Sequence, residues 1–274
     1  MKRALLDMVV IITGASAGIG RALAVELGQH GARLALAARR LDRLEALNRE
    51  LGGDHLCVAA DVAQTPDCVR IVDETLRRFG RIDTLVCNAG YGFQAPVAQT
   101  TDEQMLAVFQ TNVIGTLACI RAATPHMLKQ EMRDGWRGQI MIVSSAVARR
   151  SLPFFGAYSA TKAAQLSLAE AMRVEVSPRQ ICVTSVHPGG TQSEFGDVSA
   201  SLSGGKRPGR IAGEIQQTSQ EVARAMLRAI ERPRPEVWPI ALYRWATGLG
   251  TLMPRLVDRM MSSRRGQLSP GEPI

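Results

Sequence analysis

A tyrosine and a lysine stand four positions apart in the segment YSATK, at residues 158 and 162. On a helix this spacing stacks the two side chains on one face, about 5–6 Å apart at Cβ. A phenol with a reference pKa of about 10 is a poor acid or base near pH 7, and an adjacent ammonium favours its ionised form. The pair is either two ordinary residues on a solvated helix face or a tyrosine that Lys162 tunes for proton transfer.

A glycine-rich turn near the N-terminus has the composition of an anion-binding loop. The segment TGASAGIG carries glycines at positions 14, 18 and 20, directly after the apolar run MVVIIT of residues 8–13. A strand, a tight turn and a helix start offer free amide groups and a positive dipole end to a pyrophosphate. The spacing is G-x-x-x-G-x-G rather than G-x-G-x-x-G. The alternative is that these glycines only punctuate the backbone.

The end of the second apolar run bears on which dinucleotide is bound. An acidic residue there would bind a ribose 2′-hydroxyl, whereas an arginine accommodates a 2′-phosphate. The segment LALAARRLDR places Ala38 where the acid would stand, followed by Arg39 and Arg40. This favours NADP(H), although the two arginines would also suit the start of an exposed helix.

These residues depend on a regular alternation of elements. Apolar, β-branched runs predict strands over residues 8–13, 33–38, 55–60, 82–87, 138–144 and 180–186, and a short edge strand over 236–240. Helical periodicity predicts helices over residues 18–30, 41–51, 66–79, 102–131 and 156–176. Near-continuous apolar strands joined by helices imply a parallel sheet covered on both faces. We therefore predict one doubly wound, Rossmann-type α/β domain with about seven parallel strands, which binds ligands at their carboxyl ends.

Local signals define some helix ends. Thr100 stands three residues before Glu103, and Thr218 stands three residues before Glu221, which are capping-box patterns. Pro125 is expected to bend or divide the helix predicted over residues 102–131.

Five motifs in order carry a resemblance to a known family. They are TGASAGIG, NAG at 88–90, TNVIG at 111–115, VSS at 143–145 and YSATK. Together they resemble the short-chain dehydrogenase/reductase family over about residues 8–195. The resemblance implies a catalytic set of Asn112, Ser145, Tyr158 and Lys162, in which Ser145 is chosen over Ser144 because the family's serine precedes the tyrosine by thirteen residues.

The roles of these residues follow from the resemblance. Tyr158 would donate a proton, and Ser145 a hydrogen bond, to a carbonyl oxygen while hydride reaches the carbon. Lys162 would lower the pKa of Tyr158 and bind the nicotinamide ribose. Asn112 would hold a water that relays protons to solvent.

The resemblance also implies the contacts of the cofactor. Asp61 resembles the family's adenine contact, and residues 187–195 resemble the segment beside the nicotinamide. The expected cofactor-binding residues are Gly14, Ser16, Gly18, Ile19, Gly20, Arg39, Arg40, Asp61, Val62, Asn88, Ala89, Gly90, Tyr158, Lys162, Pro188, Gly189, Thr191 and Ser193. Ala17 departs from many NADP-dependent members, which carry Lys or Arg at that position, so NAD(H) stays possible.

Composition argues against several other classes of protein. The five cysteines lack C-x-x-C spacing and the four histidines form no ligand pattern, so we expect no metal and a reducing cytoplasm. No apolar run of 18 residues predicts a spanning helix, and Asp7 interrupts the apolar N-terminus, against a secretion signal. The net charge is +8, and twelve Lys and Arg but only six Asp and Glu follow Ala200. A basic tail can bind nucleic acid or an anionic membrane, but no nucleic-acid motif occurs and we expect no such partner.

Two segments are expected to shape the substrate side. Residues 190–215, within a domain of residues 1–240, form the predicted substrate loop, and residues 195–213 are predicted to be a mobile lid rather than an ordinary surface loop. Residues 241–274 form a C-terminal extension. In it an apolar stripe follows helical spacing, interrupted by Pro254, while arginines 244, 255 and 259 lie off the stripe; its members are Trp245, Leu249, Leu252, Leu256 and Met260.

The extension resembles those of family members that act on steroids, retinoids or long-chain ketones. We expect it to cover a substrate pocket or to pack on a second subunit of a dimer or tetramer, ahead of peripheral membrane contact. The sequence thus predicts a cytoplasmic, homo-oligomeric oxidoreductase that uses NADP(H) on a hydrophobic ketone or secondary alcohol. The alternative is a non-catalytic NADP(H)-binding sensor or regulatory protein with the same fold.

Overall fold

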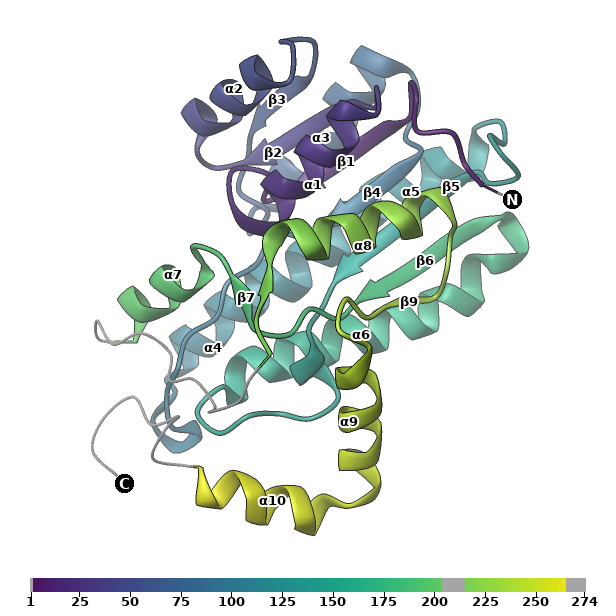
Figure 1. The fold of residues 1–274 in the computed structure, drawn as a ribbon. Coiled ribbons are helices and arrows are strands. Elements are labelled where there is room, and N and C mark those ends of the chain that lie inside the picture. Colours follow the sequence, from purple (N-terminus) through teal and green to yellow (C-terminus); the bar gives the residue numbers. More distant parts are fainter. Residues whose placement is uncertain (1, 204–214, 265–274) are drawn as a thin grey trace.

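The computed structural model describes residues 2–203 and 215–264. Seven strands form one parallel sheet in the order β3-β2-β1-β4-β5-β6-β9 (Figure 1). They are β1 (Val9–Thr13), β2 (Arg33–Ala38), β3 (Leu56–Ala59), β4 (Thr84–Cys87), β5 (Gly138–Val143), β6 (Ile181–Val186) and β9 (Glu236–Val237). The strand order reverses between β1 and β4, and this switch point opens a crevice at the carboxyl ends of the strands. The predicted doubly wound fold is confirmed.

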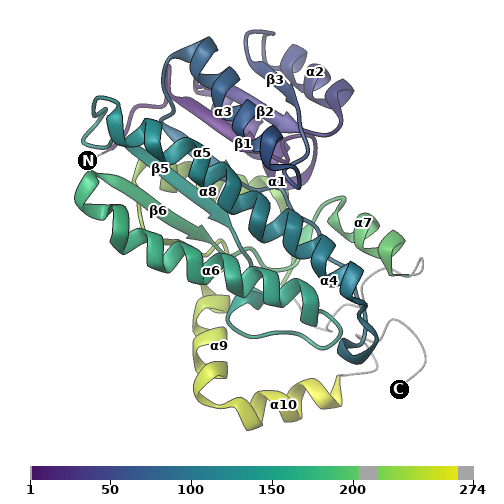
Figure 2. The same cartoon turned by 180° about the vertical axis from the view of Figure 1, so that it is seen from behind.

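Helices cover both faces of the sheet, as the two opposite views show (Figures 1 and 2). One face carries α1 (Gly18–Gln29), α2 (Leu41–Glu50) and α8 (Ser219–Glu231). The other carries α3 (Thr65–Phe79), α5 (Gly115–Lys129) and α6 (Gly156–Val176). A separate cluster of buried apolar residues fills each of the two interfaces. Strands read as continuous apolar runs because each of their faces meets one cluster; all of VVIIT in β1 is buried.

The long helix after β4 differs from the prediction in two details. The capping box is formed by Thr101 and Gln104, one position later than expected, and it begins α4 (Asp102–Phe109). Pro125 lies inside α5 without dividing it. Because proline has no N–H, the helical hydrogen bond to the carbonyl of Arg121 is lost. Arg121 is exposed, so water can bond to that oxygen instead. The helical path is instead interrupted by one π-helical turn, η2 (Gln110–Ile114).

The helical stretch Asp102–Lys129 is long and apolar enough to cross a membrane, judged by length and composition alone. In the fold its α5 part packs on α3, β4 and β5. It contributes Ala118, Cys119 and Ala123 to the core cluster beneath the sheet. The stretch therefore has the packing of a core helix.

The C-terminal third builds the rim of the crevice. A two-residue parallel pair, β7 (Thr191–Gln192) with β8 (Gln217–Thr218), brackets the short helix α7 (Phe195–Leu202). The described part of the predicted lid is thus helical, and residues 204–213 of it lie outside the described residues. The Thr218–Glu221 capping box and the edge position of β9 are confirmed.

The extension forms two helices, α9 (Ala241–Leu252) and α10 (Pro254–Ser263), drawn in yellow in Figure 1. Pro254 is the first residue of α10, where a missing N–H costs no helical bond, and it separates the two helices as expected.

Candidate active site

A cavity of about 1030 Å³ lies at the carboxyl ends of the strands. Eighteen of the twenty residues predicted from the sequence to form the site line this cavity. The two exceptions are Gly20 and Asn112. Both lie beneath the site, where they support residues that do line it.

The glycine-rich turn is held rigidly against the strand next to it. Gly14 has φ +68°, and a Cβ on it would lie 2.9 Å from the Cα of Ala89, so only glycine fits. Asn88 fixes the turn from below: its Nδ2 donates to the carbonyls of Thr13 at 2.9 Å and of Gly14 at 3.3 Å. Asn88 therefore acts on the backbone of the turn, although the residue itself borders the cavity.

The turn leads directly into α1, which begins at Gly18 without a side-chain cap because Ala17 precedes it. The first-turn amides are thus left for an anion. Gly20 faces the turn so closely that a Cβ on it would lie 2.4 Å from the carbonyl oxygen of Gly14. This close-packed cradle with free amides fits the pyrophosphate of a dinucleotide.

The two arginines after β2 differ in their contacts. Arg40 forms an ion pair with Glu194 at 3.0 Å and donates to the hydroxyl of Ser16 at 3.1 Å. Arg43 holds the same carboxylate at 2.6 Å, and the two arginines lower the pKa of Glu194. Arg39 is exposed at the cavity and has no ion pair or hydrogen bond with any of the described residues. Arg39 can therefore bind a ligand phosphate without losing an existing ion pair or hydrogen bond, whereas Arg40 cannot.

Asp61, the predicted adenine contact, lines the cavity after β3. One of its carboxylate oxygens accepts from the amide of Ala63 at 3.0 Å. One oxygen of the Asp61 carboxylate is thus bonded within its own loop.

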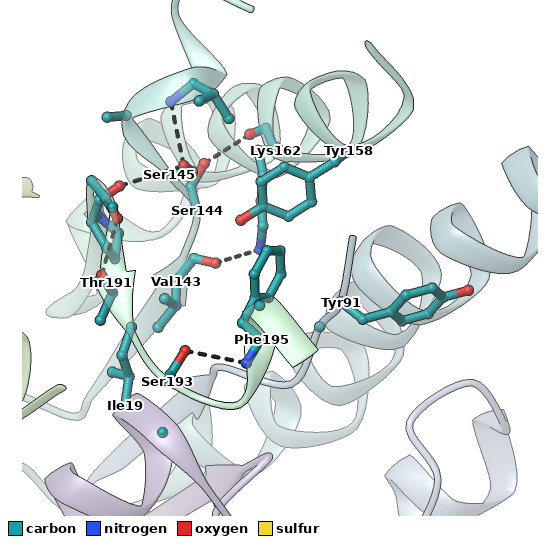
Figure 3. Close-up of a pocket in the computed structure, with 18 of the residues that line it drawn as sticks. Ile19, Tyr91, Val143, Ser144, Ser145, Tyr158, Lys162, Thr191, Ser193 and Phe195 are labelled. Carbon is teal, nitrogen blue, oxygen red and sulfur yellow. Dashed lines mark hydrogen bonds between the residues drawn. The ribbon is translucent and has the colours of Figure 1, made fainter. Parts of the chain in front are cut away.

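Tyr158 and Lys162 lie one turn apart at the start of α6, next to the aromatic ring of Phe195 (Figure 3). The ring centroids of Tyr158 and Phe195 are 5.2 Å apart, and Lys162 Nζ lies 5.5 Å from the Tyr158 centroid. Burial raises the pKa of Tyr158 to about 12, and a hydrogen bond with Ser145 acts in the opposite direction. Burial is therefore the dominant influence on this pKa in the structure, and the lowering expected from Lys162 together with the nicotinamide charge stays a prediction. The phenol is held protonated, as a proton donor must be.

Lys162 is buried, with 4% of its surface exposed. Its ammonium donates to the main-chain oxygen of Val143 and to Oε1 of Gln165, each at 2.9 Å. Both acceptors are neutral, and burial lowers the pKa of Lys162 to about 7. The balance between the charged and neutral forms of this lysine is thus close to even near neutral pH.

The two serines after β5 have different orientations. The hydroxyl of Ser144 donates to the main-chain oxygen of Lys162 at 2.8 Å, which fixes β5 to α6. The hydroxyl of Ser145 accepts from the amide of Val147 at 3.3 Å and reaches Tyr158. The geometry agrees with the choice of Ser145.

Asn112 is hydrogen-bonded through both its side chain and its main-chain oxygen. Its carboxamide exchanges two hydrogen bonds with the main chain of Tyr91 and donates a third to Thr161 Oγ1. Its main-chain oxygen accepts from Thr116 Oγ1 and from Gln165 Nε2, each at 2.7 Å. The main-chain oxygen of Asn112 thus has no lone pair left for a water, and the predicted water-holding role of this residue stays a prediction.

Two further residues support the site: Gln165, which escaped the sequence analysis, and His187, the first residue of the segment 187–195 expected beside the nicotinamide. Gln165 contacts Lys162 and Asn112. The sequence signal that could have revealed it is a polar side chain on the buried face of a helix, since Gln165 shares that face with the buried Ala169 four residues later. His187 is fully buried under Ser145, stacked on Trp238 with ring centroids 4.2 Å apart. Its two ring nitrogens lie 3.3 Å from the main-chain oxygen of Ser145 and 3.0 Å from Ser185 Oγ. Burial lowers the pKa of His187 to about 4.

The substrate end of the cavity has apolar walls. The loop after β5 and helix α7 supply Leu152, Phe155 and Phe195. The extension supplies Tyr243 of α9, whose ring lies on Gly189 so closely that a Cβ there would be 2.1 Å from it. The Tyr243 hydroxyl donates to the main-chain oxygen of Ile215 at 2.9 Å.

Of the five residues in the predicted stripe of the extension, only Met260 lines the cavity, and the other four do not. Trp245 and Leu252 are 70% and 80% exposed. The residues of α9 and α10 that line the cavity are Leu242, Tyr243, Ala246, Thr247, Gly250, Val257, Met260, Met261 and Arg264. An ion pair between Arg150 and Asp258 ties α10 to the loop that follows β5. The extension therefore closes the cavity with a face that mixes polar, small and apolar residues, which helical hydrophobicity does not reveal.

Comparisons with known proteins show the family of the chain and agree with its fold. The family model described as short chain dehydrogenase matches residues 8–201, and the chain belongs to the short-chain dehydrogenase/reductase family. It is 33% identical over 258 residues to an 11-beta-hydroxysteroid dehydrogenase-like 3 protein of Arabidopsis thaliana, covering 91% of this chain and 79% of that protein. The protein is therefore an oxidoreductase of the dehydrogenase/reductase type that acts on CH–OH or C=O groups.

Solved structures share the architecture. A short-chain dehydrogenase/reductase from Burkholderia phymatum in complex with NAD has a TM-score of 0.81 at 24% identity and covers 99% of both chains, which is a likeness of fold. An alcohol dehydrogenase from Thermococcus sibiricus, complexed with 5-hydroxy-NADP, has a TM-score of 0.71 at 28% identity and covers 84% of this chain and 94% of its own.

No group of three or more His, Cys, Asp or Glu side chains that could hold a metal ion occurs in residues 2–203 and 215–264.

Proposed function

We propose that the protein is an NADP(H)-dependent oxidoreductase that interconverts a hydrophobic ketone and its secondary alcohol. The observation that carries the proposal is the meeting of Tyr158, Ser145 and Lys162 in one cavity with a glycine-rich anion cradle. Hydride transfer at the carbonyl carbon is the chemistry that the nicotinamide supplies when it is bound. All other steps belong to side chains of this chain.

Ser145 and Tyr158 act on the substrate oxygen. In reduction, the Ser145 hydroxyl donates a hydrogen bond to that oxygen, and Tyr158 gives it a proton while negative charge develops there. A phenol with a pKa of about 12 is protonated and ready for this step. The ammonium of Lys162 stabilises the phenolate that remains. In oxidation the phenolate takes the proton back.

The preference for NADP(H) rests on the end of β2. Ala38 leaves no carboxylate to bind a 2′-hydroxyl or to repel a 2′-phosphate, and Arg39 is available for that phosphate. The two solved structures above carry NAD in one case and an NADP derivative in the other. A nicotinamide dinucleotide is thus common to both, and the choice between its two forms is proposed from Ala38 and Arg39.

A bulky apolar substrate fits the walls of the cavity. Leu152, Phe155 and Tyr243 offer hydrophobic contact, and the volume of about 1030 Å³ has room for a large ligand beside a dinucleotide. The name of the Arabidopsis relative points to hydroxysteroids. We propose ketones of the size and polarity of a steroid as the substrate class.

The rival proposal is a sensor that binds the dinucleotide without turnover. A panel of ketones and alcohols, assayed with purified protein and both NADPH and NADH, separates the two. We expect oxidation of NADPH with large apolar ketones and weaker activity with small polar ones. Tight binding of NADPH with no oxidation across the whole panel would establish the sensor.

We also propose a homo-oligomer in the cytoplasm. All five cysteines are free thiols, which suits a reducing compartment. Light scattering on the purified protein measures the oligomeric state, and a monomer at working concentrations would refute that part.

A further inference from the structure

Gln165 lies on α6, fully buried, three residues after Lys162. Its Oε1 accepts from the ammonium of Lys162 at 2.9 Å. Its Nε2 donates to the main-chain oxygen of Asn112 at 2.7 Å and to Thr116 Oγ1 at 2.9 Å. One carboxamide thus joins the ammonium at the site to the π-helical turn η2.

The orientation of this carboxamide follows from its partners. The Asn112 carbonyl can only accept a hydrogen bond, and a lysine ammonium can only donate one. The nitrogen of Gln165 must therefore face Asn112 and its oxygen must face Lys162. The reverse orientation would set a carbonyl against a carbonyl and an N–H against an ammonium.

The bridge occupies the position at which a water would connect Lys162 to Asn112. The Asn112 carbonyl has two lone pairs, and Thr116 Oγ1 and Gln165 Nε2 fill both. A carboxamide neither gains nor loses a proton near neutral pH, so it passes no proton from Lys162 to solvent. On this side the lysine is held but not connected to a proton path.

We propose that Gln165 is a positioning residue, which holds the Lys162 ammonium beneath Tyr158 and seals it from proton exchange on the Asn112 side. The inference rests on the proposed function, because it assumes that Lys162 serves Tyr158. Val143 from β5, Asn112 from η2 and Thr116 from α5 are neutral, and Tyr158 is the titratable group that faces Lys162 among the described residues. Gln165 therefore supplies one of the two neutral acceptors that stabilise the charged form of Lys162.

The first test uses the protein alone and requires no turnover. Lys162 has a pKa of about 7 when folded, below the ordinary 10.5, so the unfolded chain binds the extra proton between these values. This contribution makes stability rise with pH from about 7 to 10. Gln165→Glu sets a carboxylate beside the ammonium and raises the pKa of Lys162, so the rise should shrink. Gln165→Leu removes an acceptor of the charged form, so the rise should begin about one pH unit lower. Urea midpoints between pH 6 and 9 measure both changes.

The second test measures turnover. In Gln165→Leu the weaker ammonium stabilises the Tyr158 phenolate less, so the pH profile of kcat/KM for alcohol oxidation should move up by about one unit. We expect kcat to fall about tenfold while KM for the alcohol changes little. Fluorescence titration with NADPH reports whether the cradle is intact.

A matched control is Gln139→Leu. Gln139 is equally buried, bonds Arg3 at 2.9 Å and Thr184 at 2.9 Å, and lies outside the cavity. It should lower stability without moving either pH profile; if it fails to fold, the equally uncharged variant Gln139→Met replaces it. If both Gln165 variants keep the wild-type pH dependence of stability, Gln165 is only a packing residue and the inference is wrong. If that dependence shifts as expected but the wild type turns over no substrate, the bridge stands and the proposed function fails.

Discussion

The dinucleotide end of the cavity and its C-terminal wall are built by different means. At the dinucleotide end the backbone does most of the shaping: Gly14 has no room for a side chain, and Asn88 bonds the carbonyls of the turn. At the other end two helices place a few side chains on the cavity, among them Tyr243, while Trp245 and Leu252 on their outer faces are exposed. Backbone geometry tolerates few sequences, whereas a wall of side chains tolerates many.

This difference predicts where substitutions should have the largest effects on activity and stability. Groups near the cradle and Tyr158 have several partners each, so replacing one leaves others buried and unpaired. Side chains on the outer face of α9 touch mainly solvent. We therefore expect effects to fall steeply from the catalytic tyrosine to the outer helices.

The largest effect is expected for Tyr158→Phe. The change removes the proton donor and keeps the ring that packs on Phe195 at 5.2 Å. We expect turnover to fall roughly a thousandfold, within the usual contribution of a general acid. Fluorescence titration should show NADPH binding close to the wild type. Near-normal turnover of the pure variant would remove the basis of the mechanism.

The next effect concerns cofactor choice. Ala38→Asp combined with Arg39→Leu should reverse the preference from NADPH to NADH, because the carboxylate binds a 2′-hydroxyl and repels a 2′-phosphate. Loss of one charge-assisted bond predicts a change of roughly ten- to a hundredfold in the ratio of kcat/KM values. Arg49→Leu, on the exposed end of α2, controls for loss of charge. A parent enzyme that already prefers NADH would refute our interpretation of Ala38 and Arg39.

The third effect is a loss of stability at acid pH, caused by His187, which is buried beneath Ser145. The pKa of His187 is about 4 in the fold and near 6.5 in the unfolded chain, so the unfolded chain binds more protons between these values. This contribution to stability is full above pH 6.5 and is lost as pH falls towards 4. It should amount to about 2 kcal/mol between pH 7 and 5.

Urea unfolding at the two pH values tests this, with His187→Gln as the comparison. Glu236, Arg149 and Arg173 also face the ring, and they remain in the variant. If the variant loses as much stability as the wild type on acidification, other groups carry the effect.

The smallest effect is expected on the outer face of the extension. Trp245→Ser with Leu252→Ser should change the free energy of unfolding by less than about 0.5 kcal/mol, because both side chains are mostly exposed. Under the proposal of a homo-oligomer that uses this face, light scattering should show weaker self-association. A variant that keeps its oligomeric state and loses only binding to anionic vesicles would assign the face to a membrane.

The sequence allowed prediction of what depends on local constraints. A tight turn and a single helical turn fix the geometry of Gly14 and of the pair Tyr158 and Lys162 within a few residues, while the roles expected of the pair rest on the resemblance to the family. Gln165 was missed because its partners Asn112 and Thr116 lie 53 and 49 residues away, and only the packing of α6 on η2 and α5 brings them together.

Other errors have similarly physical causes. In the segment TTDEQ both threonines have an acidic or amide residue three positions later, so the pattern could not choose between Thr100 and Thr101. The hydrophobic stripe of the extension predicts a contact surface, but it does not show which partner covers it: four of its five residues lie outside the cavity wall, and packing on a second subunit stays a prediction. In the fold the buried face includes Thr247 and Gly250, which carry little hydrophobic signal.

The short pair of β7 and β8 has a consequence for how the family can diversify. Gln217 donates through its amide to the carbonyl of Gly190 and through Nε2 to Thr191 Oγ1, each at 3.0 Å, so both ends of segment 193–216 are pinned to the site. Lengthening a loop with fixed ends costs only about 0.6 kcal/mol for each doubling of its length. The part of this segment that follows Phe195 can therefore change in length and sequence, in evolution or by design, while Ser193, Phe195 and Tyr158 keep their positions.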